Sequence, residues 1–491
     1  MNGAMPSLAE AAMDNLGRLL LERFESISGA PALNDTGGTL SYRVLAGEAL
    51  KVASALNSLG VSEDEPVLVS VANEARDVSA LIGVWLAGGV VVPVGRHSPD
   101  AAIDGLCEVT GARFVITNDE TELVTRVSHQ EPPIRPLLEG AALIIFTSGT
   151  TGRPKGVVLS HHAFVGKLHA IDEMLSFTQK TRTLLVLQIT FVFGLWVTLL
   201  TLLKGGTVWM HRRFDPVEVL TVLKDKHISD VALVPTMIRK ILANNESLLA
   251  DSVDNIEPFR ILTGGEPLGL ALGRRLQMLV PHVGVVDVYG LTETCSSDFF
   301  LREKDQVKFA GTIGHPGPQV QFRIADDQGR QLPVKQVGEL QIRTPFIMNG
   351  YLDEPDLTRS AFVDGFFRTG DLAQVREDGR VELAGRIKDL IMRGGTKVSP
   401  LELDHILLEH PAVAAALTTG IPDEILGERI HALIVPRADA SVDEADLRDW
   451  IANRIERFKW PDVYHFVPEL PTGHTGKVNR NALREQLLRE S

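Results

Sequence analysis

A run rich in hydroxyls and glycines follows an apolar segment directly and has the composition of an anion-binding loop. The apolar segment covers 142–146, and the loop 147–156 has the sequence TSGTTGRPKG. Glycines let the backbone approach a phosphate, and successive backbone N–H groups can surround an anion. Hydroxyls donate to phosphate oxygens, while Arg153 and Lys155 add positive charge. The spacing differs from that of a Walker loop, so we expect a phosphate site of another kind rather than a solvated turn.

An aromatic ring, a hydroxyl and a carboxylate lie close together after a second apolar run, 283–288. In the segment 289–293, Tyr289 offers a face on which a purine can stack, and Thr292 offers a hydroxyl. Glu293 suits Mg²⁺, which prefers one or two carboxylates together with phosphate oxygens and water. A strand end with a capping threonine is the alternative that these residues alone leave open.

Three further segments carry polar groups in glycine-containing loops. Asp371 follows a glycine, where its carboxylate can accept from two ribose hydroxyls or cap a turn. Lys477 precedes a helix expected over 481–490; a compact positive charge suits a phosphoryl transition state, although an ordinary solvated lysine has the same local sequence. The segment 264–267 could present its backbone to a base edge or form a simple turn.

Together these segments resemble the adenylate-forming superfamily, which comprises acyl-CoA synthetases, peptide-synthetase adenylation domains and luciferases. The likeness extends from about Leu40 to Leu483. Six motifs follow the order of the family, and they occupy residues 147–156, 264–268, 288–294, 367–372, 385–390 and 471–478.

The resemblance implies a role for each matching residue. Tyr289 would stack on adenine, Asp371 with Arg386 would hold the ribose, and Lys477 would bridge the carboxylate and the α-phosphate. The implied catalytic residues are Lys477, Thr292 and Glu293, with Glu293 as the Mg²⁺ ligand. The implied nucleotide-binding residues are Thr147, Ser148, Gly149, Thr150, Thr151, Gly152, Lys155, Gly265, Glu266, Pro267, Tyr289, Asp371 and Arg386.

The same resemblance implies that a small C-terminal domain rotates between two half-reactions. Lys388 would be its hinge, with Asp389 as the second candidate, because the family uses either residue type here. The loop of Arg393, Gly394 and Gly395 would then line a tunnel for the pantetheine thiol.

The acid pocket is expected around an apolar segment that contains no carboxylate, Leu184–Leu203. Amino-acid-activating relatives place an Asp within the stretch that corresponds to 189–193, and a buried ammonium without a partner would cost several kcal/mol, as an order of magnitude. The substrate is therefore predicted not to be an α-amino acid. Many CoA ligases carry a His where Phe191 falls, and this chain departs from that pattern. The residues expected to line the pocket are Phe191, Val192, Trp196, Met237, Gly264 and Leu291.

These observations predict an ATP-dependent acyl-CoA ligase that uses Mg²⁺ and activates an apolar aliphatic or aromatic acid. The first alternative is an acyl-AMP ligase that loads a holo acyl carrier protein, because both acceptors present the same thiol. A nucleotide-binding relative without chemistry is disfavoured because Glu293, Asp371, Arg386 and Lys477 are all present. A light-emitting oxygenase is a more distant alternative. A homodimer is possible.

Composition agrees with a globular intracellular enzyme. The 491 residues carry 49 basic and 63 acidic side chains, a formal charge of 49 − 63 = −14, which argues against a general nucleic-acid binder. Cys107 and Cys295 cannot form a disulfide scaffold, and the N-terminus shows no secretory pattern, so a cytoplasmic location is expected.

The elements that must position these residues are predicted to form an α/β fold. Apolar runs such as 67–71, 90–94 and 113–116 recur every 20–25 residues, which indicates βα units and a largely parallel sheet. Further strands are expected at 143–146, 183–187, 230–234 and 259–262. After Gly311, runs at 320–324 and 338–343 indicate a barrel-like β unit.

A small, mobile α+β domain is expected at the C-terminus. Its predicted elements are helices at 400–409 and 444–457 and strands at 412–421 and 429–436. The boundary is placed at 385–389, giving domains 1–387 and 388–491. The uncharged segment Leu184–Leu203 is interpreted as a buried strand, a turn near Gly194 and a buried helix; a membrane span is the alternative.

Overall fold

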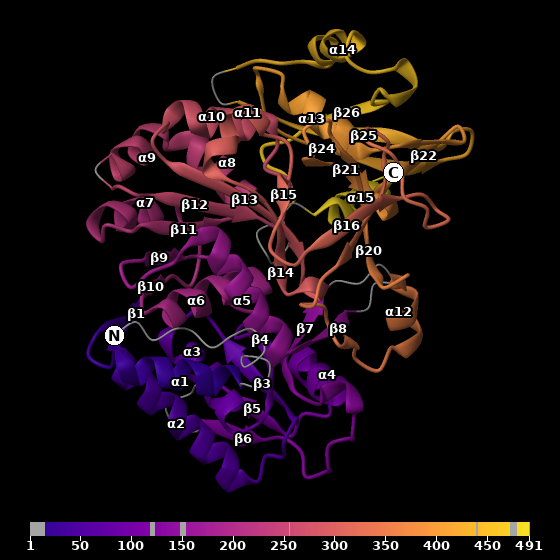
Figure 1. Ribbon diagram of the computed structural model, residues 1–491. Coiled ribbons are helices and arrows are strands. Elements are labelled where there is room, and N and C mark those ends of the chain that lie inside the picture. The colour runs from indigo at the N-terminus through magenta and orange to yellow at the C-terminus, as the bar shows by residue number, and fades with distance from the viewer. Residues whose placement is uncertain are drawn as a thin grey trace.

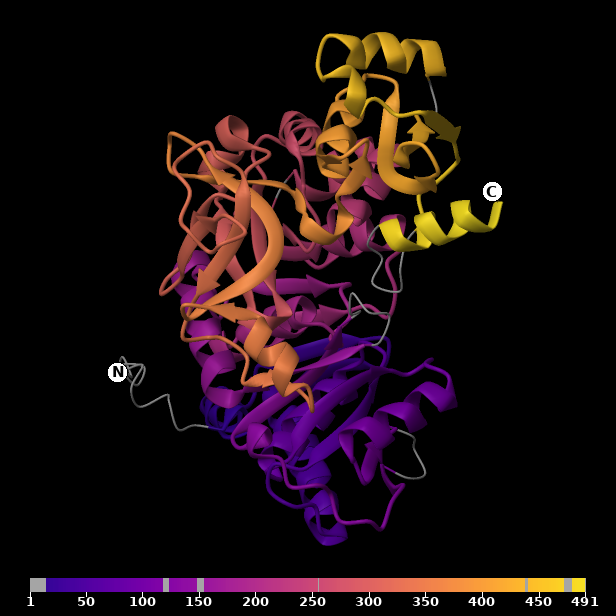
Figure 2. The same cartoon turned by 90° about the vertical axis from the view of Figure 1, so that its right-hand side faces the viewer.

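The computed structural model describes residues 15–117, 123–147, 154–254, 256–437, 440–471 and 479–490. In this described part, the strands form four sheets: A and B in the N-terminal region, C as a half-barrel beside them, and D in the C-terminal domain. The C-terminal domain lies at one end of the molecule and the first residues of sheet B at the other (Figure 1, Figure 2). The predicted α/β class with a β unit and a small C-terminal α+β domain is confirmed.

Sheet B carries the strand that leads into the glycine-rich loop. Its order is β18-β8-β7-β4-β3-β5-β6, with β3, β4, β5 and β7 joined in parallel. Buried valines fill β3 and β4, because both faces of a parallel sheet are covered. The βα units predicted here are confirmed. The strands are β3 (Pro66–Val71), β4 (Val90–Gly95), β5 (Phe114–Ile116), β6 (Val124–Arg126), β7 (Ala141–Thr147), β8 (Lys155–Ser160) and β18 (Gly350–Tyr351).

Sheet A carries the segment of Tyr289 and Glu293. Its order is β15-β14-β13-β12-β11-β9-β10-β1-β2, parallel from β13 through β10 to β1. The main core gathers apolar side chains from sheets A and B and from the helices between them. The strands are β1 (Pro31–Asp35), β2 (Gly38–Ser41), β9 (Arg182–Leu185), β10 (Thr207–Met210), β11 (Asp230–Leu233), β12 (Arg260–Gly264), β13 (Gly284–Leu291), β14 (Ser296–Leu301) and β15 (His315–Pro316).

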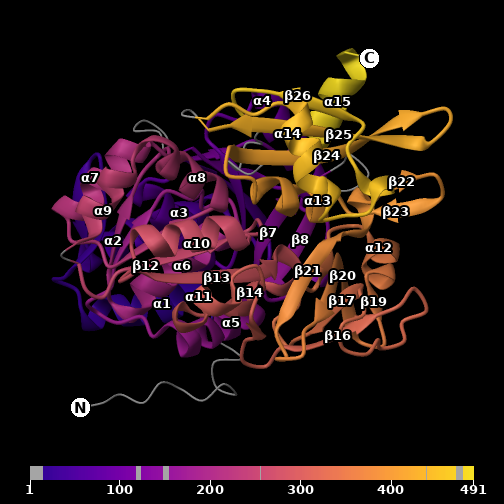
Figure 3. The same cartoon turned by 90° about the horizontal axis from the view of Figure 1, so that it is seen from above.

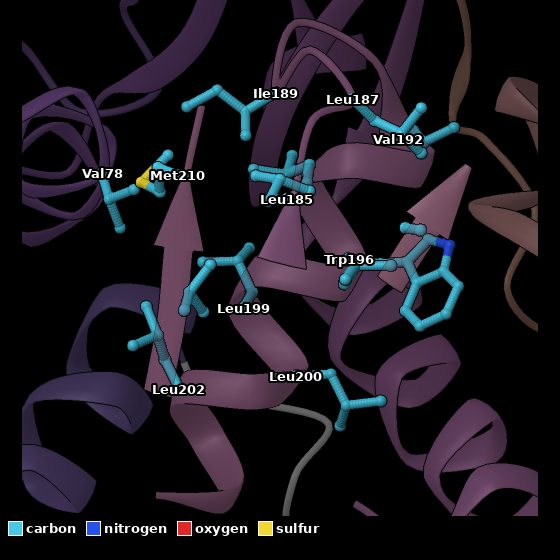
Figure 4. Close-up of a cluster of buried hydrophobic side chains, with 14 of the residues drawn as sticks. Val78, Leu185, Leu187, Ile189, Val192, Trp196, Leu199, Leu200, Leu202 and Met210 are labelled. Carbon is cyan, nitrogen blue, oxygen red and sulfur yellow. The ribbon is translucent and has the colours of Figure 1, made fainter. Parts of the chain in front are cut away.

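The uncharged segment Leu184–Leu203 is a buried strand followed by a buried helix, as predicted, but the turn lies earlier than Gly194. Strand β9 ends at Leu185, and helix α6 (Val192–Lys204) already contains Gly194. A Cβ at Gly194 would lie 2.6 Å from the carbonyl oxygen of Gln188, so this glycine lets the helix pack against the preceding loop. Side chains of α6 and its neighbours form part of the core (Figure 4). Among the described residues, no helix is long and apolar enough to cross a membrane.

Sheets C and D follow later in the chain. Sheet C has the order β16-β17-β20-β19 with β21 beside β20, and sheet D has the order β23-β22-β25-β24 with β26 beside β25. The strands are β16 (Gln321–Ala325), β17 (Gly338–Arg343), β19 (Phe362–Val363), β20 (Phe366–Val375), β21 (Val381–Arg386), β22 (Ile391–Arg393), β23 (Thr396–Val398), β24 (Val413–Asp423), β25 (Gly427–Pro436) and β26 (Val463–Phe466). The helix predicted at 444–457 ends at Ala452, and Ile455 then packs into the core of the domain.

Helices cover the sheets and connect their strands. The longer α-helices in the N-terminal region are α1 (Leu16–Ser26), α2 (Tyr42–Leu59), α3 (Ala75–Leu86), α4 (Asp100–Thr110), α5 (His161–Leu175), α7 (Pro216–Asp225), α8 (Pro235–Asn244), α9 (Glu246–Val253) and α10 (Leu270–Leu279). The remaining α-helices are α11 (Glu303–Phe309), α12 (Pro355–Ser360), α13 (Pro400–Leu408), α14 (Glu444–Ala452) and α15 (Arg480–Glu490). The 3₁₀ turns are η2 (Pro136–Leu138), η3 (Thr292–Thr294), η4 (Ile387–Asp389) and η5 (Arg457–Lys459).

Candidate active site

Three predicted nucleotide ligands form one hydrogen-bonded group, which we call the carboxylate cluster (Tyr289, Asp371, Arg386). The Tyr289 hydroxyl donates to Asp371 Oδ2 at 2.6 Å, and Arg386 Nε lies 2.8 Å from Asp371 Oδ1. Asp371 on β20 is 4% exposed and is the register partner of Arg386 on β21. Burial and the neighbouring carboxylate raise the pKa of the Tyr289 phenol well above its ordinary value, so the phenol stays a donor. The cluster joins β13 of sheet A to the half-barrel.

Glu293 is held from two sides. Its carboxylate accepts from the Tyr351 hydroxyl at 2.9 Å, and its backbone carbonyl accepts from Met348 N–H at 2.7 Å. The Lys155 ammonium lies 5.4 Å from the centre of the Tyr351 ring. Tyr351 therefore connects the strand that leaves the glycine-rich loop to the turn of Thr292 and Glu293. One carboxylate at this position fits Mg²⁺, which takes most of its other ligands from phosphate and water.

The segment after β12 presents its backbone and an oriented carboxylate. The Glu266 oxygens both accept from the Thr236 hydroxyl at 3.0 Å, and Arg239 lies 3.4 Å from one of them. Gly265 has a φ of +82°, which glycine adopts without strain. Gly264 is buried where the Val288 carbonyl leaves no room for a Cβ. Thr236 and Arg239 of α8 thus orient the Glu266 carboxylate, and the backbone of this segment is also available to a ligand.

Asp287 is a candidate site residue that the sequence prediction missed. It lies two residues before Tyr289, so alternation on β13 puts both side chains on the same face. Burial raises the pKa of its carboxyl well above the ordinary value, and no described residue pairs with it. A buried carboxyl beside a ring that can stack on a base is suited to bind the exocyclic amino group of that base. An acidic residue inside a run of valines was the available signal.

The residues predicted to line the acid pocket lie around the start of α6 and the end of β13. Phe191 is the half-buried N-cap of α6, and Leu291 packs against both the main core and the core of the half-barrel. Val192 and Met237 are each 8% exposed. Trp196 is fully buried, stacked on Phe193 with ring centres 5.6 Å apart, so it forms core beneath this region.

Asn73 is a second residue that the sequence prediction missed. Its Nδ2 donates to the carbonyls of Leu187 at 2.8 Å and His211 at 3.2 Å, and its Oδ1 accepts from Ile189 N–H at 3.0 Å. Asn73 is fully buried with a φ of +61°. It therefore fixes the loop that leads into Phe191. No local pattern marks an asparagine for this role, because its partners lie more than one hundred residues away.

The predicted tunnel loop is at the tip of the β22–β23 hairpin, on the side of the C-terminal domain (Figure 3). Arg393 donates to the carbonyls of Phe458 and Trp460 and pairs with Asp462 at 2.6 Å, all within its own domain. Cβ atoms at Gly394 and Gly395 would meet open space. The structure does not bring this hairpin to the carboxylate cluster. Lys388, the predicted hinge, is exposed in η4 between the two domains.

The predicted residues Ser148, Gly149, Thr150, Thr151, Gly152 and Lys477 lie outside the described residues, so their roles stay predictions. Thr147 ends β7, and Lys155 begins β8 as its register partner. Helix α13 of the C-terminal domain meets the N-terminal region at Gly269. A Cβ added to Gly269 would lie 3.9 Å from His405 Nε2 of this helix. The Ser399 hydroxyl donates to the Ala384 carbonyl next to the predicted boundary.

Comparisons with known proteins show which family this chain resembles. A family model described as AMP-binding enzyme matches residues 22–352, and its C-terminal domain model matches 402–477. A feruloyl-CoA synthase of Amycolatopsis sp is 29% identical, over 96% of this chain and 99% of its own length. A 2-succinylbenzoate–CoA ligase of Bacillus licheniformis is 30% identical, over 90% of this chain and 94% of its own length. The fatty acid–acyl-carrier-protein ligase ScoC of Streptomyces coeruleorubidus is 29% identical, over 94% of each chain. The ATP-bound crystal structure of MatB from Rhodopseudomonas palustris aligns with a TM-score of 0.85 at 25% identity, covering 96% of this chain and 98% of that one.

Proposed function

We propose, since this chain belongs to the AMP-binding enzyme family, that it is an ATP-dependent acyl-CoA ligase for an apolar carboxylic acid without an α-amino group. The membership makes the chain an AMP-forming acid–thiol ligase that uses ATP, Mg²⁺ and CoA. The acid, the acceptor and the residue roles are our proposals. The observation that carries the proposed adenylation is the carboxylate cluster, formed beside a separately held Glu293.

In the first half-reaction the acid carboxylate attacks the α-phosphorus of ATP, pyrophosphate leaves, and an acyl-adenylate remains bound. Asp371 accepts from the ribose hydroxyls, while Tyr289 and Arg386 hold its carboxylate in place. Glu293 would hold Mg²⁺, which supplies charge neutralisation to the phosphates. Lys477 and the loop that starts at Thr147 neutralise the remaining phosphate charge, and catalysis consists mainly of positioning.

The nature of the acid is proposed from the charges around the pocket. The segment that leads into α6 and α6 itself carry no carboxylate before Lys204. The nearby Glu266 is already bound by Thr236 and Arg239 and does not offer a free partner to an α-ammonium. Phe191, Val192 and Met237 present apolar surface instead. An α-amino acid would have to bury an additional ammonium without a partner there, whereas an aliphatic or aromatic acid would not.

In the second half-reaction a thiol attacks the acyl carbonyl and AMP leaves. We propose that residues 388–491 rotate about Lys388 and bring the Arg393–Gly395 hairpin to the acyl-adenylate, because in this structure the hairpin contacts its own domain. CoA is the preferred acceptor, as the names of the feruloyl and succinylbenzoate relatives contain it. The carrier-protein ligase among the relatives makes a holo acyl carrier protein the second candidate.

Pyrophosphate release with a panel of fatty, aryl, cyclic and amino acids tests the first half of the proposal. We expect release with one or more apolar acids and none with amino acids. Lys477→Ala should abolish ATP–pyrophosphate exchange, whereas Lys224→Ala, an exposed lysine on α7, should retain it. Exchange that survives in Lys477→Ala contradicts the assigned role.

The acceptor is identified by adding either free CoA or a holo carrier protein to the acid that gives release. Acyl-CoA formation supports the first proposal, and exclusive loading of the carrier supports the second. If amino acids are activated in preference to every apolar acid, the proposed substrate class is wrong.

A further inference from the structure

The turn that carries Thr292 and Glu293 is conformationally strained. Directly after it, Cys295 and Ser296 have φ values of +57° and +88°, a region that side chains other than glycine rarely adopt. The ladder between β13 and β14 shifts register at Tyr289 and Gly290. Such a backbone persists only where its surroundings fix it. The question is therefore which contacts hold this turn.

A buried ion pair lies immediately beyond the turn. Lys167 on α5 places its Nζ 2.7 Å from Asp298 Oδ1, and the two side chains are 2% and 0% exposed. The same Nζ donates to the Ser297 carbonyl at 3.2 Å. The other oxygen of Asp298 accepts from the Thr294 hydroxyl. Thr294 is the last residue of η3, so the pair is one hydrogen bond away from the turn.

Lys167 also supports the opposite side of Glu293. Its ammonium lies 5.2 Å from the centre of the Phe346 ring. The same ring packs closely against Gly166, because a Cβ on that glycine would be only 2.5 Å from a ring atom. Two residues further, Met348 N–H donates to the Glu293 carbonyl at 2.7 Å. One lysine thus braces both chain segments that hold Glu293.

We propose that the buried Lys167–Asp298 pair, acting through Thr294, is a positioning device for Glu293 and sets the affinity of the enzyme for Mg²⁺–ATP. The pair does not contact substrate. A purely structural pair could be replaced by apolar side chains without functional loss, because its burial costs as much as its attraction gains. This inference rests on the proposed role of Glu293 as the metal ligand.

The sharpest variant leaves the ion pair intact. Thr294→Val removes the bond to Asp298, and Thr294→Ser keeps it. Calorimetric titration of each protein with ATP at several Mg²⁺ concentrations measures binding without requiring turnover. We expect the Mg²⁺ concentration for half-maximal ATP binding to rise about tenfold in Thr294→Val and to return near wild type in Thr294→Ser, the size typical when the partner of a metal ligand is lost.

The double variant Lys167→Met/Asp298→Leu removes the charges and keeps the volume. It should show the same increase in required Mg²⁺ while its melting temperature stays near that of the wild type. Arg113→Met/Glu65→Leu is the matched control. This buried pair at 2.7 Å joins the residues just before β5 and β3 of sheet B, and its removal should leave the Mg²⁺ requirement unchanged. If Thr294→Val, or a folded double variant, binds ATP with the wild-type Mg²⁺ requirement, the positioning role is wrong. A wild-type protein that binds Mg²⁺–ATP but activates no acid would refute the proposed function instead.

Discussion

The carboxylate cluster and the β22–β23 hairpin represent two ways of building a site. The cluster draws Tyr289, Asp371 and Arg386 from three strands and bonds them directly in the N-terminal region and half-barrel. Arg393 in the hairpin is equally well bonded, but only to partners in its own domain. Under the proposed function, the groups that would hold the ribose are preassembled, whereas the hairpin would have to be delivered by motion.

The largest effect is expected where the cluster loses its charge. Asp371→Asn leaves Arg386 without a carboxylate and weakens the grip on a ribose, so kcat/KM for ATP should fall ~100-fold. The rate of ATP–pyrophosphate exchange measures this loss in kcat/KM. The control is Asp364→Asn, which changes an exposed carboxylate paired with Arg323 on sheet C. This variant should leave ATP–pyrophosphate exchange unchanged. Equal losses in both variants would mean that the cluster is not a preassembled site.

A smaller and more selective effect is expected at the hairpin. Arg393→Met breaks the bonds to the Phe458 and Trp460 carbonyls and to Asp462, and should lower acyl-CoA formation ~10-fold, as expected for losing hydrogen bonds to a charged group. Exchange of pyrophosphate into ATP should change less than ~2-fold. Both rates are measured on one preparation. A parallel loss of the two activities would erase the distinction between the regions.

The loop that leads into the acid pocket provides a finer test of preassembly. Asn73→Asp keeps an acceptor for Ile189 N–H but turns a carboxylate toward the Leu187 and His211 carbonyls. The KM for the acid should rise ~5-fold while the KM for ATP is unchanged. Thr201→Val removes a buried 2.8 Å bond between Thr201 on α6 and Thr183 on β9, and it serves as the control for general destabilisation. A KM for the acid that rises equally in the control would assign the effect to stability.

The last prediction concerns the stability of the N-terminal region toward acid. Burial lowers the pKa of His161 to about 4, and its Nδ1 accepts from Leu16 N–H at 3.0 Å, which requires an unprotonated nitrogen. The neutral imidazole therefore contributes to the free energy of unfolding, by at most about 3 kcal/mol. This contribution is complete above ~6.5, the pKa of histidine in the unfolded chain, and is lost as the pH falls toward 4. Melting curves of wild type and His161→Gln between pH 7 and 4.5 measure it. Identical pH dependences would contradict the assignment.

Local patterns predicted the parallel strands, because apolar runs recur at the spacing of βα units. The family resemblance, rather than a local pattern, named Tyr289, Asp371 and Arg386 together, and they lie on three different strands, β13, β20 and β21. The turn assigned near Gly194 was wrong, since glycine there serves a close approach to Gln188 rather than a turn. Asn73 and Lys167 were not predicted as site residues, because their importance comes from burial and from partners far along the chain, which no single segment reveals. Asp287 was missed although an acidic residue inside a run of valines marked its position.

The two-residue strand β18 has a consequence for how the protein is made. It pairs Gly350 and Tyr351 with Val158 and Val157 on the outer edge of β8. During synthesis Tyr351 leaves the ribosome long after Ser160, so the edge of β8 stays unpaired in the nascent chain. Until translation has passed residue 351, that edge presents unpaired backbone N–H and C=O groups to which another extended chain could add a strand.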